Sequence, residues 1–140
     1  MSADNFLDSN ILIYLFDSDN LVKQQRATAL IRQSLETGTA CTSYQVVQEV
    51  VNVLVQKLKM THQEVSSFLA TTLVPLWCVN PSETLIKRGL DIQLRYTYSF
   101  YDSLIIAAAL EAGCSTLYTE DLQHNQQIQT LTIKNPSKDT

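Results

Sequence analysis

Short apolar runs alternate along this chain with longer segments in which apolar positions recur every three or four residues. The short runs predict strands and the longer segments predict helices. Strands are expected at residues 5–8, 39–42, 74–79, 115–118 and 131–133. Helices are expected at residues 11–16, 20–36, 44–59, 61–73, 81–96, 101–112 and 121–129. This alternation predicts one α/β domain with a parallel sheet of about four to five strands and helices on both faces.

Capping residues support several of these boundaries. Gly38 follows the helix at 20–36 and is a suitable C-terminal residue. Ser43 can cap the long helix that follows it. Thr61 and Glu64 have the spacing of a capping box. These signals indicate that the helices begin and end close to the predicted positions.

Length and composition indicate a cytoplasmic protein of one domain. The 140 residues are 45% apolar and 17% charged, as is ordinary for a globular protein. No tract approaches the roughly 20 apolar residues that cross a bilayer, and the first residues lack the features of a signal peptide. The net charge of −4 argues against a general nucleic-acid coat. It leaves a nuclease open, since carboxylates that surround metal ions also carry negative charge.

The three cysteines do not form a recognisable motif. Cys41, Cys78 and Cys114 are far apart, with no CxxC pair and no nearby histidine. This spacing disfavours a zinc site. We expect reduced thiols packed among apolar residues.

Four acidic residues lie where simple solvation does not explain them. Asp8 ends the first strand, Asp121 follows the fourth, and Asp102 begins the most apolar helix. Parallel sheets bind ligands beyond the carboxyl ends of their strands, although each aspartate could instead cap a helix. Glu49 lies in the middle of a helix beside a valine stripe, where capping is no explanation. A position on the solvated border of that helix is its alternative.

Together these acids indicate a metal site. Four clustered carboxylates would raise one another's pKa unless cations compensate them. Mg²⁺ or Mn²⁺ would do so, since hard cations prefer oxygen ligands. A water bound to such an ion can attack phosphorus, which makes phosphodiester hydrolysis a candidate reaction.

Four ordered stretches resemble the PIN-domain family, and within it the VapC-type toxins of bacterial toxin–antitoxin pairs. They are FLDSNIL at 6–12, QEV at 48–50, YDSLIIAAA at 101–109 and LYTEDLQH at 117–124. The resemblance implies a PIN-like nuclease domain over residues 1–134, a polar C-terminal tail over 135–140, and an endoribonuclease that depends on Mg²⁺ or Mn²⁺. It further implies an RNA substrate, a cognate antitoxin and a homodimer.

The resemblance also assigns roles to residues. Asp8, Asp102 and Asp121 would hold the principal metal ion, and Glu49 would complete the site directly or through water. Asn10 and Thr119 would have supporting roles. The alternative is a catalytically inactive PIN-fold module that binds a partner protein or RNA. Nothing in the sequence identifies the RNA target.

Overall fold

A six-stranded sheet forms the centre of the computed structural model, which describes residues 3–138. Its order is β3-β2-β1-β4-β6-β5, and every neighbouring pair is parallel except the antiparallel β5–β6 hairpin. The predicted α/β class and mostly parallel sheet are therefore confirmed, with six strands in place of four to five. The strands are β1 (Asn5–Leu7), β2 (Ala40–Ser43), β3 (Trp77–Val79), β4 (Thr116–Tyr118), β5 (Gln127–Ile128) and β6 (Leu131–Lys134).

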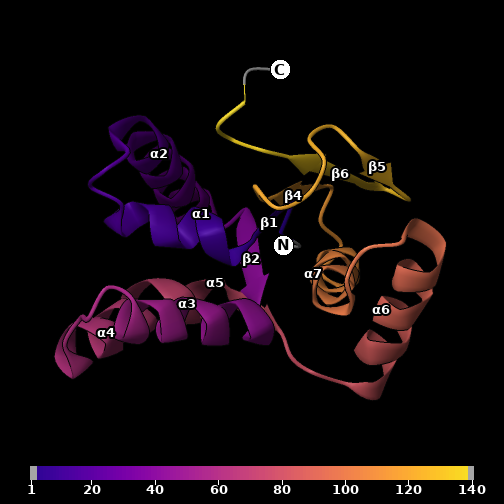
Figure 1. Ribbon diagram of the computed structural model, residues 1–140, viewed down its shortest axis with the longest axis horizontal. Coiled ribbons are helices and arrows are strands. Elements are labelled where there is room, and N and C mark those ends of the chain that lie inside the picture. Colours follow the sequence, from indigo (N-terminus) through magenta and orange to yellow (C-terminus); the bar gives the residue numbers. More distant parts are fainter. Residues whose placement is uncertain (1–2, 139–140) are drawn as a thin grey trace.

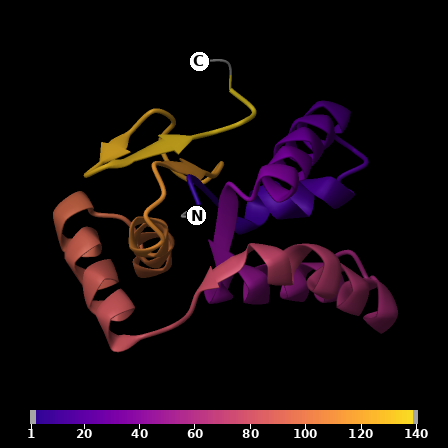
Figure 2. The ribbon, with the colours of Figure 1, turned by 180° about the vertical axis from the view of Figure 1, so that it is seen from behind.

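The helices form two groups, with β1 and β2 between them (Figure 1). Helices α1 to α5 lie on one side, and α6 with α7 on the other, as the view from behind also shows (Figure 2). A 3₁₀ turn (Tyr14–Phe16) follows α1, and a π-helical turn (Leu69–Leu73) joins α4 to α5. The helices are α1 (Ser9–Ile13), α2 (Leu21–Thr37), α3 (Tyr44–Gln56), α4 (His62–Phe68), α5 (Val74–Leu76), α6 (Glu83–Tyr96) and α7 (Phe100–Glu111).

The capping residues predicted for α2, α3 and α4 are present in the structure. Gly38 ends α2 in the left-handed conformation, with φ 66°. Ser43 caps α3, and Thr61 with Glu64 makes both hydrogen bonds of a capping box. Helix α6 begins slightly later than predicted, at Glu83, because Ser82 is its N-cap.

Two sequence predictions are wrong. The strand expected at 74–79 begins only at Trp77, because the π-helical turn leads into the short helix α5. The helix expected at 121–129 is absent, and turns followed by β5 take its place. Asn125 and Gln129 have φ of 69° and 55°, which an α-helix does not accommodate. This segment therefore forms a hairpin with β6.

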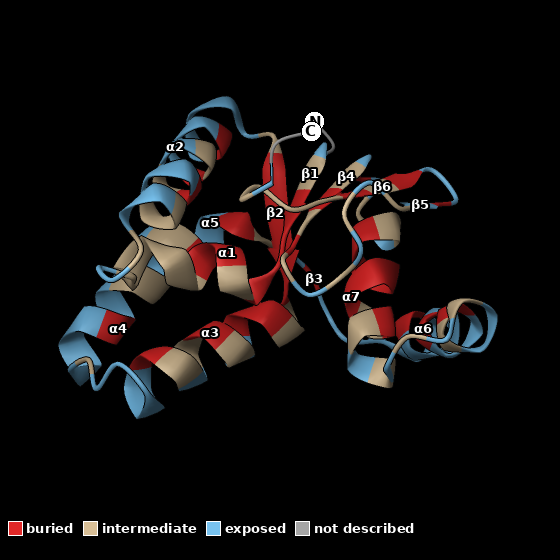
Figure 3. Cartoon of the chain, turned by 45° about the horizontal axis from the view of Figure 1, so that its top comes forward, coloured by how far each residue is buried: buried red, intermediate tan, exposed pale blue. Residues whose placement is uncertain are grey.

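The core lies along the sheet and against α7 (Figure 3). Phe6 and Leu117 of the two central strands are fully buried, as is Ile106 of α7. Burial of residues 105–109 explains why α7 is apolar on nearly every face. Within residues 3–138, no helix combines the length and apolarity that crossing a membrane requires. The fold brings the carboxyl ends of β1 and β4 together beside the start of α3.

Candidate active site

Asp8 lies directly beyond β1 and is almost completely buried, with 4% of its surface exposed. Its Oδ1 accepts the backbone N–H of Ser9 at 2.7 Å, so Asp8 is indeed the N-cap of α1. Its Oδ2 accepts the hydroxyl of Thr119 at 2.8 Å. The capping explanation therefore holds for one oxygen, while the other faces the end of β4.

Glu49 reaches the same site from α3. Ser9 Oγ donates to Glu49 Oε2 at 2.9 Å and lies 3.4 Å from Asp8 Oδ1, so one hydroxyl joins the two carboxylates. Gln45, one helical turn earlier, donates to Glu49 Oε1 at 3.0 Å. The neighbouring Val46 and Val50 are fully buried, as the valine stripe predicted. Glu49 is thus a half-buried carboxylate held in place by two donors.

Thr119 connects Asp8 to Asp121. Its hydroxyl donates to Asp8 and accepts the backbone N–H of Asp121 at 3.1 Å. Asn10 Oδ1 accepts the N–H of Glu120 at 3.4 Å, while its buried Nδ2 has no hydrogen-bond partner among residues 3–138. Asp121 itself is exposed and starts no helix, so capping is no explanation for it.

Asp102 belongs to the first turn of α7 without capping it. The cap is Ser99, whose Oγ accepts the backbone N–H of Asp102 at 3.2 Å. The charge of Asp102 raises the pKa of Asp121, so the two carboxylates share one electrostatic environment. The structure therefore brings all four predicted acids to one region, from β1, α3, α7 and the end of β4.

The electrostatics of this region are unfavourable for the protein alone. Burial, and then the charges of Asp121 and Glu49, raise the pKa of Asp8 to about 6, although hydrogen bonds from Thr119 and Ser9 oppose the shift. Burial and the charge of Asp102 raise the pKa of Asp121. Within the described chain, no lysine or arginine pairs with any of the four acids. The acids thus form an uncompensated negative cluster.

Glu120 contributes a neighbouring network that the sequence did not reveal. Its side chain is only 15% exposed and pairs with Lys23 at 3.2 Å. Tyr14 donates to one carboxylate oxygen, and Ser137 Oγ donates to the other at 2.6 Å. This network ties α2 and residue 137 of the predicted tail to the segment that carries Asp121. Residues 139 and 140 of that tail lie outside the described residues.

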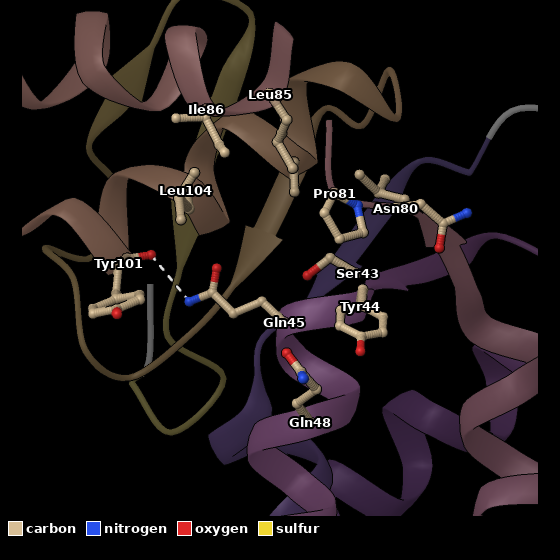
Figure 4. Close-up of a pocket in the computed structure, with 12 residues that line it drawn as sticks. Ser43, Tyr44, Gln45, Gln48, Asn80, Pro81, Leu85, Ile86, Tyr101 and Leu104 are labelled. Atoms are coloured by element: carbon tan, nitrogen blue, oxygen red, sulfur yellow. Dashed lines mark hydrogen bonds between the residues drawn. The ribbon is translucent and has the colours of Figure 1, made fainter. Parts of the chain in front are cut away.

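A hollow of about 210 Å³ opens between the start of α3 and helices α6 and α7 (Figure 4). Gln45 lines it and donates to both Glu49 and the backbone carbonyl of Tyr101, the latter at 3.3 Å. The walls are mostly apolar, with the amide of Gln48 among the polar groups. None of the four acids lines this hollow, and Gln45 is the residue that connects it to Glu49.

The donor set suits a hard divalent cation, because all four groups are carboxylates and none is paired with a lysine or arginine in the described part of the chain. As the side chains stand, no three His, Cys, Asp or Glu residues within 3–138 form a group that could hold a metal ion. Mg²⁺ commonly keeps several waters and uses only one or two carboxylates directly. The site therefore fits a hydrated ion with some contacts made through water.

Comparison with known proteins identifies a family model and several solved structures that the chain resembles. The family model described as PIN domain matches residues 6–127. No curated protein matches the sequence. A chain of a toxin–antitoxin complex from Klebsiella pneumoniae is 24% identical with a TM-score of 0.68, and the match covers 97% of this chain and 100% of that one.

Two further solved structures share the fold at 17% identity. One is Mycobacterium tuberculosis VapC20, a toxin that cleaves the sarcin–ricin loop, with a TM-score of 0.60 over 84% of this chain and 92% of that one. The other is VapBC2 from Rickettsia felis bound to a DNA fragment from its promoter, with a TM-score of 0.66 over 94% and 97%.

Proposed function

The chain belongs to the PIN domain family, and we propose that it is a divalent-metal-dependent endoribonuclease, the toxin of a toxin–antitoxin pair. One observation carries the proposal: four carboxylates lie in one region near the carboxyl ends of β1 and β4, and within residues 3–138 no lysine or arginine pairs with them. Such a cluster is costly unless a ligand compensates it. A bound metal ion would compensate these charges, and metal-assisted phosphodiester hydrolysis is the activity that would use it.

The four acids have two kinds of role in the proposed site. Asp8, Asp102 and Asp121 would hold a Mg²⁺ or Mn²⁺ ion, with part of the contact through the waters that the ion keeps. Glu49 would complete the site directly or through water. When bound, the ion would supply an activated water as nucleophile and stabilise charge on the leaving oxygen.

The polar neighbours position these acids. Ser9 holds Glu49 beside Asp8, and Thr119 fixes both the Asp8 carboxylate and the backbone of Asp121. Gln45 restrains Glu49 from the other side. Orientation by such hydrogen bonds reduces the reorganisation that the site needs when substrate arrives. We assign positioning roles to all three residues, and a role in orienting the Asp121 segment to Asn10.

The fold neighbours support the assignment of partners. The Klebsiella pneumoniae and Rickettsia felis proteins are parts of toxin–antitoxin assemblies, and VapC20 is a toxin that cleaves the sarcin–ricin loop. We accordingly propose RNA as the substrate and a cognate antitoxin as the inhibitor. The homodimer stays a prediction from the family resemblance.

The test is cleavage of defined RNAs by the purified chain. Transfer RNA and a sarcin–ricin loop fragment are incubated with protein in EDTA, Mg²⁺ or Mn²⁺, and the products are resolved on denaturing gels. We expect cleavage that needs the metal and is lost in Asp8→Asn and Asp102→Asn. Asp91→Asn, which changes an exposed acid on α6, is the matched control and should cleave like the unaltered protein.

Two results would contradict the proposal. Cleavage that persists unchanged in both site variants would show that the activity belongs to another protein. RNA binding without cleavage under all metal conditions would support the alternative, a catalytically inactive PIN-fold module.

A further inference from the structure

The three cysteines, far apart in sequence, lie in one region of the fold. Cys41 belongs to β2, Cys78 to the neighbouring edge strand β3, and Cys114 lies between α7 and β4. The Sγ atoms of Cys41 and Cys114 are 3.6 Å apart, and both residues are buried, at 3% and 2% exposure. The cluster does not form a group suited to a metal ion within residues 3–138.

Cys78 gives this buried pair an exposed neighbour. Cys78 is exposed, and it lines a hollow of about 360 Å³ together with Cys41. The small residues Ala3, Gly38 and Ala112 also line the hollow, beside Pro75 and Leu76. Because Cys78 is exposed and Cys41 is buried, a small solute reaches Cys78 more readily than Cys41.

The two thiols that line the hollow differ in chemical character. The Cys41 thiol lowers the pKa of the Cys78 thiol. The neighbouring Cys114 and Cys78 thiols, together with burial, raise the pKa of Cys41. The thiolate is the reactive nucleophile, and peroxide-sensitive cysteines are accessible, acidic and next to a second thiol. This is the arrangement of an attacking and a resolving cysteine.

We propose that Cys78 is a peroxide-oxidised cysteine and that Cys41 resolves it as an intramolecular disulfide between β3 and β2. The proposal is independent of the ribonuclease function, because it uses no residue of the acidic site. Its ligand class is a small hydroperoxide, for which hydrogen peroxide is the probe.

The chemistry proceeds in two balanced steps. The Cys78 thiolate attacks one peroxide oxygen, the O–O bond breaks, and hydroxide or alkoxide leaves and takes up the proton that the thiol had released, becoming water or an alcohol as the peroxide is reduced. Cys78 is then a sulfenic acid, oxidised by two electrons. The Cys41 sulfur attacks the Cys78 sulfur, the S–O bond breaks, and water leaves with the Cys41 proton as the S–S bond forms.

Cys114 offers a second resting state for the disulfide. Its sulfur can attack Cys41, the S–S bond to Cys78 breaks, and Cys78 takes up the proton that Cys114 releases. This exchange changes no oxidation state and moves the disulfide into the core. Without Cys114, the disulfide would remain between Cys41 and Cys78.

The experiment counts thiols after peroxide treatment of the full chain. Protein in EDTA is exposed to a small excess of hydrogen peroxide, quenched with catalase, unfolded in guanidinium chloride containing N-ethylmaleimide, and weighed intact. We expect three alkylated thiols before oxidation, and one afterwards with a loss of two hydrogens. Cys78→Ser should slow disulfide formation roughly tenfold or more, because the accessible thiolate is gone. Cys114→Ser is the matched control and should form a Cys41–Cys78 disulfide at the normal rate.

Peptide mapping distinguishes the outcomes. A disulfide from Cys41 to Cys78 or Cys114 in the unaltered protein, combined with the slow Cys78→Ser variant, supports the proposal. Equal oxidation rates in Cys78→Ser and the unaltered protein would overturn it. So would a disulfide between two chains, or sulfinic acid at Cys78 with a free Cys41 thiol. Circular dichroism before treatment verifies that both variants are folded.

Discussion

Replacing Asp8 with asparagine should stabilise the metal-free protein at neutral pH. The pKa of Asp8 is about 6 in the fold against the ordinary value of 3.8. One pKa unit corresponds to about 1.4 kcal/mol, so ionising Asp8 within the fold costs about 3 kcal/mol. Asparagine avoids this cost. Its amide oxygen can still accept the Ser9 N–H, and its NH₂ can face the Thr119 hydroxyl.

The pH dependence has a defined sign. Because the folded state binds the Asp8 proton more tightly, this group's contribution is fully present below pH 3.8 and is lost as the pH rises through about 6. Asp8→Asn should therefore exceed the unaltered protein by about 3 kcal/mol in free energy of unfolding at pH 7.5. The difference should shrink towards zero near pH 4.

Urea denaturation in EDTA at pH 4, 5, 6 and 7.5 measures this difference. Asp91→Asn is the control, since exposed substitutions change stability by about 0.5 kcal/mol or less. A variant less stable than the unaltered protein at pH 7.5, or an advantage that grows as the pH falls, would refute the reasoning. Addition of Mg²⁺ should narrow the gap, because the ion stabilises only the form that binds it.

Two further substitutions test the support around the site. Thr119→Val removes a buried hydroxyl that bonds Asp8 and Asp121. Urea denaturation should show a loss of about 1–3 kcal/mol in the free energy of unfolding, and RNA cleavage should fall. Unchanged values for both would show that the hydroxyl is dispensable. Gly89→Ala places a Cβ 2.8 Å from Leu104 Cδ2 where α6 packs on α7. Thermal unfolding should show a loss of about 1–3 kcal/mol in the free energy of unfolding. A gain in stability would show that Leu104 moves aside freely.

Helix ends and the central strands were predictable because their signals are local. Ser43, Gly38 and the Thr61–Glu64 pair act on backbone groups within a few residues. The run at 74–79 was ambiguous, since a short apolar run fits either a strand or a buried helix. The polar run at 121–129 has no continuous apolar stripe, and Asn125 in the left-handed region ends any helix there.

The candidate site was predictable at the level of its acids alone. Asp8 and Asp121 follow strands that end at the same edge of the sheet, which sequence order can indicate. The bridge through Ser9 depends on how α1 packs against α3, and the burial of Glu120 depends on Ser137. The Gln45–Glu49 spacing of four residues was an available signal for the donor on α3. No spacing pattern in the sequence predicts that the three cysteines lie in one region of the fold.

Titration of Mn²⁺ into the metal-free protein, followed by calorimetry, tests the acidic site most directly. We expect saturable binding to the unaltered chain and to Asp91→Asn. Asp121→Asn and Asp102→Asn should bind roughly tenfold or more weakly, since each removes a carboxylate from the cluster. Equal affinity in all four proteins, or no binding to the unaltered chain, would contradict a metal site built from these acids.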